Sequence, residues 1–453
     1  MNFIRSNFDF KKRTMMVSVL NNRFGSWFGA FPCNRWIVFL MLLFSSCAVF
    51  YPTFNNELMS GWDDQWQVVN AYTAGGMNWD NLKPAFLYAF HGQYSPLNQC
   101  IYTFIYSFVG YTPGYYHAYS LLFHILNSFL VYVLLRKMLV SVTAFSVRHC
   151  AWIAFLVSMF FCIHPMQVET VAWASASKMV VSTSCYLCST YFFIRYLTDK
   201  KRVFYLSSLF FFIVSYGFKE QVVTLPLWFL LILFCYGADL RTFKTWRKLI
   251  PFFIIALVMG LFFVLETKST PLFAVPDPDV VTYSWWQRLV FSVYALFEYI
   301  WKWLFPYKLL YKYYYPMAPG SPLPLWLLMY PLLLVVCLGG CYKYLVRKPV
   351  LVGLLFFLIH IALVLHIIPI NRAHIVADRY MYLAGVGLSF IVVYYAAFWF
   401  VRLRTAFKFV CTFATVVVFL LLAMYSFSRT EKWHDTERLR EEVRQSVGTV
   451  DKE

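Results

Sequence analysis

The chain carries little charge. Asp, Glu, Lys and Arg make up 13% of its 453 residues, whereas a soluble domain carries about 25%. Its 11 cysteines are too sparse for a disulfide scaffold, and it has few of the polar linkers that divide a long soluble chain into domains. Hydrophobic residues account for 61% and aromatic residues for 21%. This composition excludes a disordered chain and an ordinary cytosolic enzyme, and it predicts an all-α polytopic membrane protein.

Apolar segments of membrane-spanning length recur along the chain. A span needs about 20 apolar residues and must be helical, because lipid offers the backbone no hydrogen-bond partners. Two apolar stretches, 94–111 and 286–304, are predicted as helices at the outer leaflet, since counting them as spans would invert the basic loops between them. A chain with about thirteen spans and a weaker charge bias is the alternative. We expect about eleven spans, at residues 36–52, 115–135, 150–165, 172–195, 203–218, 222–237, 249–266, 323–342, 350–369, 380–401 and 406–427.

The basic residues mark one side of the membrane. Lys and Arg number 39 against 21 Asp and Glu, and they cluster at alternate ends of the apolar segments, as in cytoplasmic loops. They form no single patch, so nucleic acid is not an expected partner. The N-terminal stretch lacks a small-residue cleavage site, so we expect a cytoplasmic arm and no signal peptide. The predicted parts are this basic arm (1–35), a transmembrane domain (36–428) with a first outer loop (53–93), and an extracytoplasmic tail (429–453).

Two adjacent carboxylates follow the first span. In the sequence Gly-Trp-Asp-Asp-Gln-Trp, Asp63 and Asp64 are framed by Trp62 and Trp66. One carboxylate could accept a proton from an attacking hydroxyl while the other holds a divalent ion or orients the first. The alternative is that Asp63 or Asp64 only caps the helix that begins there.

A second acid and two lysines lie at later outer ends of spans. Pro165 is expected to end the third span and place Glu169 at the mouth of an outer cavity. His164, just before it, is expected to be a satisfied interfacial histidine more often than a metal ligand. Lys178 follows at the start of the fourth span. Lys219, between the fifth and sixth spans, could bind phosphate or form a self-neutralising pair with its neighbour Glu220.

The last outer loop concentrates groups that bind phosphate. Arg372, His374, Arg379 and Tyr380 lie within a few residues of one another at the start of a span. Arginine matches phosphate oxygens bidentately, which suits the phosphate of a lipid ligand near the headgroups. The alternative is a surface pair between Asp378 and Arg379 beside an aromatic belt.

Several motifs are missing from the sequence. It has no Gly-x-Gly-x-x-Gly or Walker loop, so nucleotide-driven transport and dinucleotide chemistry lack their phosphate cradle. It has no His-Glu-x-x-His zinc-protease motif. Cys185 and Cys188 lie inside an apolar helix without a second pair to complete a zinc site.

The order of short motifs resembles a known family over nearly the whole chain: the multi-spanning GT-C glycosyltransferases, and within them the transmembrane and tetratricopeptide-repeat O-mannosyltransferases and their bacterial relatives. The motifs that carry the resemblance are Trp62-Asp63-Asp64, Tyr94-Ser95-Pro96-Leu97, Gly114-Tyr115-Tyr116-His117, Leu122-Phe123-His124-Ile125-Leu126-Asn127, His164-Pro165, Glu169-Thr170-Val171-Ala172-Trp173, Lys178, Leu225-Pro226-Leu227, Leu304-Phe305-Pro306, Tyr315-Pro316 and Ala377-Asp378-Arg379-Tyr380-Met381-Tyr382-Leu383.

The resemblance implies a GT-C fold and an inverting enzyme. Such an enzyme moves a sugar, a mannose-like hexose in the relatives, from a polyprenyl-phosphate carrier to a protein Ser or Thr hydroxyl. The reaction would take place on the periplasmic side of a bacterial inner membrane or the lumenal side of the endoplasmic reticulum membrane. A divalent cation, Mg²⁺ or Mn²⁺, could assist if Asp63, Asp64 or Glu169 bound it.

The resemblance also assigns residue roles. Asp63 and Asp64 match the family's acidic pair, one of them the catalytic base, and Glu169 would be a second acid near the site. Groups implied to face the carrier phosphate are Lys178, Arg379 and Lys219, joined by Arg372 and His374 of the last outer loop. Aromatic side chains expected to contact sugar or acceptor are Trp62, Trp66, Tyr94, Trp173 and Tyr380.

The chain departs from the family pattern in two places. Ser95 stands where relatives usually have arginine, and the sequence after Arg429 stops within about one helix where relatives continue into tetratricopeptide repeats. A separate subunit could then recognise the acceptor, or the acceptor could be a lipid or glycan. The alternatives are a glycan polymerase or ligase, and a flippase for lipid-linked sugars. A flippase predicts charges deep within spans, whereas here they lie at the outer ends.

Overall fold

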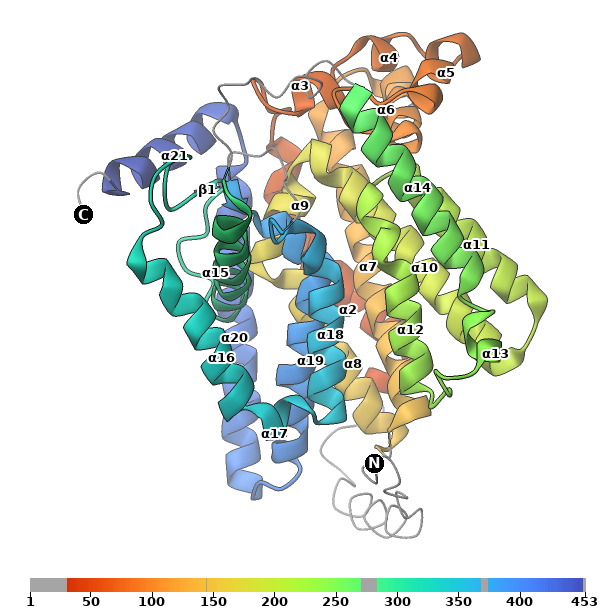
Figure 1. The fold of residues 1–453 in the computed structure, drawn as a ribbon, viewed down its shortest axis with the longest axis vertical. Coiled ribbons are helices and arrows are strands. Elements are labelled where there is room, and N and C mark those ends of the chain that lie inside the picture. The colour runs from red at the N-terminus through yellow and green to blue at the C-terminus, as the bar shows by residue number, and fades with distance from the viewer. Residues whose placement is uncertain (1–30, 144, 270–282, 368–373, 451–453) are drawn as a thin grey trace.

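The computed structural model describes residues 31–143, 145–269, 283–367 and 374–450. This part of the chain is mostly helical (Figure 1), so the prediction of an all-α protein is confirmed. Within it, strands β1 (Tyr313–Tyr314) and β2 (His374–Val376) pair antiparallel in a small two-stranded sheet. Most of the predicted arm 1–35, and Arg372 of the last outer loop, lie outside the described residues.

Each predicted apolar segment overlaps a helix. The long helices are α2 (Arg35–Phe50), α7 (Pro113–Val142), α8 (Val147–Ile163), α10 (Ser177–Asp199), α11 (Arg202–Tyr216), α12 (Leu225–Cys235), α14 (Ile250–Ser269), α16 (Met329–Gly340), α18 (Lys348–Ile361), α19 (Met381–Phe400) and α20 (Thr405–Lys432). The last of these continues past the predicted end of the transmembrane domain at 428, so Arg429 belongs to a helix and not to a tail. The tail itself forms α21 (Thr436–Val450).

Only some of these helices are long and apolar enough to cross a membrane by themselves. Among the described residues 4 helices meet that condition, at Arg35–Asn55, Pro113–Val142, Asp378–Phe400 and Thr405–Lys432. A fifth results if Val147–Ile163 and Pro165–Ala172, bent by 54° where Pro165 interrupts the chain, form one span. Other apolar helices are shorter. The expected count of about eleven spans therefore stays a prediction.

The helices pack through close backbone contacts and aromatic rings. A Cβ atom on Gly387 of α19 would lie 2.4 Å from the carbonyl oxygen of Gly353 in α18, so only glycine permits this approach. Small residues bring membrane helices together in the same way. Between α10 and α12, the rings of Phe193 and Phe229 stack with centroids 4.0 Å apart.

Contacts between distant segments define the two ends of the helical bundle. At one end, the start of α2 meets the end of α7, where Arg136 Nη1 donates to the carbonyl oxygen of Cys33 at 3.3 Å. At the other end, Asn56 Nδ2 donates to the carbonyl oxygen of Thr430 at 3.3 Å. The first outer loop and α21 therefore lie at the same end, the top of Figure 1.

The predicted outer-leaflet stretches also form helices, α6 (Pro96–Val109) and α15 (Trp285–Leu304). In α15 the buried side chains include Phe291 and Tyr299, whereas Trp285 and Trp301 are exposed. One-sided burial is typical of an amphipathic helix packed against a bundle, so the placement of α15 at the outer leaflet stays a prediction. Short helices α3 (Asp64–Gln67), α4 (Ala71–Ala74) and α5 (Trp79–Leu87) fold the first outer loop over the bundle.

Candidate functional site

The candidate site surrounds Tyr311, in the connection between α15 and β1. Its ring contacts three indoles, with centroid distances of 3.8 Å to Trp62, 5.8 Å to Trp173 and 5.3 Å to Trp433. Burial raises the pKa of Tyr311 well above its usual range. The charged groups near enough to influence this pKa are Arg379, Glu169, Asp63 and Asp64. The structure thus brings together both acids of the first outer loop, the third acid and the arginine of the last outer loop.

Asp64 is fully buried and bound on both oxygens. Its Oδ2 accepts from the backbone N–H of Met59 at 2.9 Å, and its Oδ1 accepts from the backbone N–H of Ser175 at 2.9 Å and from the Ser175 hydroxyl. Burial, which disfavours the charged carboxylate, raises the pKa of Asp64 to about 6 despite these donors. Asp64 therefore ties the first outer loop to the chain just before α10.

Asp63 is partly exposed and more loosely held. Its backbone is at the N-cap of α3, but its side chain makes no capping hydrogen bond. The carboxylate accepts one long hydrogen bond, from Gln67 Nε2 at 3.4 Å. Of the two adjacent acids, Asp63 is thus the one whose carboxylate can meet a substrate.

Glu169 and Arg379 form a buried ion pair. Glu169, in α9 (Val168–Ala172), accepts from the Arg379 backbone N–H at 2.8 Å through Oε2 and from the guanidinium through Oε1. The guanidinium lies 5.5 Å from the Trp173 ring centroid and 5.0 Å from that of Tyr380. His374 Nε2 lies 3.1 Å from Arg379 Nη2. Glu169 therefore fixes the orientation of Arg379 from two directions.

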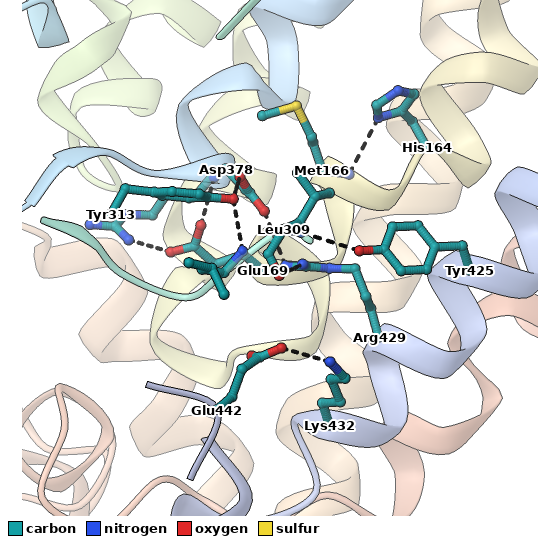
Figure 2. A network of polar contacts seen from close by, with 12 residues as sticks. His164, Met166, Glu169, Leu309, Tyr313, Asp378, Tyr425, Arg429, Lys432 and Glu442 are labelled. Atoms are coloured by element: carbon teal, nitrogen blue, oxygen red, sulfur yellow. Dashed lines mark hydrogen bonds and ion pairs between the residues drawn. The ribbon is translucent and has the colours of Figure 1, made fainter. Parts of the chain in front are cut away.

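Asp378 does not pair with its neighbour Arg379, contrary to the alternative interpretation of the last outer loop. Asp378 is fully buried and lies 3.0 Å from Arg429 Nη2 of α20 (Figure 2). It also accepts a hydrogen bond from Tyr313 of β1 at 2.9 Å. Arg429 donates further to the carbonyl oxygen of Leu309. These contacts lock the end of α20 to the loop that carries Tyr311.

Lys178, at the start of α10, points toward the first outer loop. Its Nζ donates to Gln67 Oε1 at 2.5 Å and to Gln93 Oε1. Because Gln67 also contacts Asp63, an unbroken polar chain runs from Asp63 to Lys178. Sequence reasoning missed both glutamines, which carry no charge and belong to no motif.

Lys219 lies next to this chain. Its Nζ is 2.7 Å from Glu220 Oε1, so the self-neutralising pair is present. Lys178 is close enough to Glu220 to influence its titration. Lys219 therefore places a positive charge near Lys178, and the adjacent Glu220 neutralises part of that charge.

A small cavity of about 40 Å³ extends from Arg379 into the bundle. Its polar lining includes Ser182, Thr183, Gln221 and Tyr380. The Trp173 ring lies under the Arg379 guanidinium, and its buried Nε1 has no hydrogen-bond partner among the described residues. A buried donor without a partner is energetically costly.

Trp66 and Tyr94, the other aromatic residues expected to contact sugar or acceptor, pack against residues outside the charged cluster. The Trp66 ring lies 4.8 Å from that of His91 and lines a second small pocket with Gln93. Tyr94 packs edge-on against Phe262 of α14, at 4.9 Å. Tyr94 therefore contacts α14, whereas Trp62, Trp173 and Tyr380 stay close to the charged groups.

The carboxylates do not form a set of metal ligands. Within the described residues, no group of three or more His, Cys, Asp and Glu side chains is arranged to hold a metal ion. Both oxygens of Asp64 and of Glu169 accept hydrogen bonds from protein groups. His164 is likewise satisfied, by Trp303 O at 3.0 Å and by the backbone N–H of Met166 at 3.3 Å.

The residues that sequence reasoning missed are Gln67, Gln93, Tyr311, Tyr313 and Arg429. Arg429 carried a signal, because it is a cation directly at the end of the last apolar segment. The others are uncharged residues in loops or in short elements, Gln67 at the end of α3 and Tyr313 in β1. No protein-family model, no curated protein and no solved structure matches the chain.

Proposed function

We propose that this chain is a membrane glycosyltransferase of the GT-C type that transfers a hexose from a polyprenyl-phosphate carrier to a protein Ser or Thr hydroxyl. The observation that carries the proposal is that Asp63 and Arg379 both lie close to Tyr311, at the end of an apolar helical bundle. A base and a phosphate-binding cation at that depth suit a donor whose phosphate lies at the membrane surface and whose tail lies in lipid.

Asp63 acts as the general base. As the acceptor oxygen bonds to the anomeric carbon, the bond from that carbon to the carrier phosphate breaks, and its electron pair stays on the phosphate oxygen. The hydroxyl proton passes to the Asp63 carboxylate. A single displacement of this kind inverts the anomeric centre. General base catalysis of this type contributes about 10²–10⁴-fold to the rate.

Arg379 and Lys178 bind the carrier phosphate and stabilise the charge that grows on it as the bond breaks. Glu169 is a positioning residue in this scheme, because its two oxygens hold Arg379. Lys219 attracts the phosphate more weakly, because the Glu220 carboxylate neutralises part of its charge. Trp173 offers its unpartnered Nε1 to a phosphate or sugar oxygen, and Trp62 presents an aromatic face for the sugar.

The charge distribution supports an orientation with this site outside the cytoplasm. Cationic side chains line a groove at the opposite end of the bundle, namely Arg35, Arg136, Lys137 and Arg195. Positive clusters face the cytoplasm, so the Asp63 end would face the periplasm or the lumen of the endoplasmic reticulum. We propose about eleven spans for this arrangement.

The test compares sugar transfer by purified wild-type protein, Asp63→Asn and Asp64→Asn, with synthetic polyprenyl-phosphate mannose as donor and a Ser/Thr-rich peptide as acceptor. Asp63→Asn is expected to lose about 10²-fold or more of the rate while binding the donor normally. Asp64→Asn should lower the amount of folded protein and leave the rate per folded molecule within about tenfold of wild type.

Other outcomes would contradict parts of the proposal. Equal rates for wild type and Asp63→Asn would remove Asp63 as the base. Transfer to a glycan acceptor but to no peptide would favour a polymerase or ligase, in which a sugar hydroxyl is the nucleophile. Absence of transfer from any polyprenyl-phosphate sugar, with donor binding intact, would favour a flippase.

A further inference from the structure

A cavity lies away from the candidate site, between α7, α8, α10, α12, α18 and α19. Its volume is about 450 Å³, within the range of about 300–1,000 Å³ usual for small-molecule sites. Most of its lining is aliphatic or aromatic, as with Leu135, Trp228, Phe356 and Val386. Such a lining selects a hydrocarbon chain over a polar ligand.

Cations lie at one end of this cavity. Lys348 begins α18 and Arg402 follows the end of α19, and both line the cavity. Both are exposed, and among the described residues neither forms an ion pair with a carboxylate. The Lys348 ammonium donates to the carbonyl oxygen of Cys235 at 3.3 Å, and Arg402 donates to that of Phe398 at 2.6 Å.

The side chains at this end are held in place but their charge is not neutralised. Backbone carbonyls fix both cations beside the opening without cancelling their charge. They lie at the end of the bundle that carries the basic loops, which in our proposed orientation meets the anionic lipids of the cytoplasmic leaflet. Basic pockets between membrane helices on that side bind anionic headgroups.

We propose that this cavity binds one acyl chain of an anionic glycerophospholipid, with the lipid phosphate held by Lys348 and Arg402. The apolar lining accounts for the chain, and the two cations account for the choice of an anionic headgroup over a zwitterionic one. The lipid would brace α18 and α19 against α7. This proposal does not depend on glycosyl transfer, because none of the residues that carry it belongs to the candidate site.

The test measures lipid retention by the full chain. Protein purified from micelles containing equal amounts of phosphatidylglycerol and phosphatidylcholine is examined by native mass spectrometry. In parallel, phosphatidylglycerol with a diazirine near the end of one acyl chain is photo-crosslinked and the labelled peptides are mapped. We expect phosphatidylglycerol to be retained preferentially and the label to lie on α7 and α19.

Two variants and a matched control decide the outcome. Lys348→Gln with Arg402→Gln should weaken phosphatidylglycerol binding about 25-fold, at about fivefold for each cation. Leu135→Trp, which fills the cavity, should reduce labelling with the headgroup cations intact. Lys343→Gln with Arg404→Gln removes the same charge at the same end without altering the cavity lining, and should leave binding unchanged.

Three results would overturn the proposal: equal retention of both lipids, equal losses in the cation pair variant and its control, or a label that lies outside the cavity. Displacement of the labelled lipid by a polyprenyl phosphate at equal concentration would also overturn it, because the cavity would then belong to the carrier. Labelling by the acyl probe separates a bound lipid from free phosphate, which has no chain to label α7.

Discussion

Glu169 holds Arg379 through both the backbone and the side chain, although 210 residues separate them in sequence. The backbone N–H of Arg379 donates to one carboxylate oxygen and its guanidinium to the other. A charged side chain held at both ends is preorganised, so it needs no rearrangement when a phosphate arrives. This relationship explains why an acid lies beside a proposed phosphate site.

The first prediction concerns Arg379. Arg379→Lys keeps the positive charge but loses the planar fork that contacts Glu169 and would contact phosphate. Charge-assisted hydrogen bonds contribute about 1.5–3 kcal/mol, so the KM for the lipid donor should rise about 10- to 100-fold. Initial-rate kinetics over a range of donor concentrations measures this effect.

The control for this experiment is Arg347→Lys, since Arg347 also lies over a tyrosine ring, that of Tyr344 at 4.7 Å, but at the opposite end of the bundle. The control should keep the wild-type KM. An unchanged KM in Arg379→Lys would separate Arg379 from donor binding.

The second prediction concerns the pH dependence of stability. Burial raises the pKa of Asp64 to about 6, whereas in the unfolded chain it is about 4. The folded state therefore binds more protons between these values, and stability falls as pH rises from about 4 to about 6. Asp64→Asn removes this titration.

The measurement is the thermal unfolding midpoint of wild type and Asp64→Asn across this pH range. The difference in the free energy of unfolding between wild type and Asp64→Asn should favour wild type most near pH 4. Above pH 6 this difference should be smaller by about 3 kcal/mol, because the pKa of Asp64 shifts by about two units at about 1.4 kcal/mol each. Asp63→Asn serves as the isosteric control at the neighbouring position. A difference between wild type and Asp64→Asn that stays constant with pH would contradict the burial argument.

The third prediction concerns helix packing. Gly387→Ala would place a methyl group 2.4 Å from the Gly353 carbonyl oxygen and 2.9 Å from the Phe357 backbone nitrogen. Neither backbone atom can move aside cheaply, so the variant should lose about 1–3 kcal/mol of stability. Gly339→Ala in α16 is the matched control, because nothing lies within 4 Å of the new methyl group, and helix propensity should make it neutral or stabilising. Equal thermal unfolding midpoints for wild type and Gly387→Ala would show that α18 and α19 can move apart without loss of stability.

The fourth prediction concerns orientation. An Asn-x-Thr glycosylation tag inserted after Gly76, in the first outer loop, should be glycosylated in microsomes, because we propose that this loop is lumenal. The same tag after Gly237, between α12 and α13 (Phe243–Trp246), should stay unmodified. Both glycines have positive φ and open space around them, so the insertions are comparable.

Mobility on a gel before and after deglycosylation measures both insertions. Modification after Gly237 alone would reverse the proposed orientation. Modification at both positions would show that the number of spans between them is even and not odd.

Much of the helical architecture could be predicted from the sequence, because apolar run length decides where a helix can meet lipid. Helix α7 begins at Pro113, and α10 ends at Asp199, before Lys200 with its positive φ. The break at Pro165 is expected from the proline itself, whereas the 54° bend that follows it is a property of the tertiary structure.

The candidate site could be predicted only in part. Asp63, Glu169 and Arg379 stand out because ionisable side chains are costly beside apolar segments unless they are paired or hydrated. Their partners do not stand out. Asp378 and Arg379 are adjacent, and sequence proximity suggested a local pair, yet each pairs with a residue from a distant helix.

The sequence by itself determined that the chain is helical and apolar, with its acids and its basic clusters at opposite ends of the apolar runs, because these properties follow from residue type and local spacing. Tertiary structure alone decided that Asp64 is buried against Ser175 while Asp63 stays partly exposed, and that Arg429 rather than Arg379 pairs with Asp378. Those outcomes depend on which helix ends meet in space, and neighbouring residues on a helix or turn point in different directions.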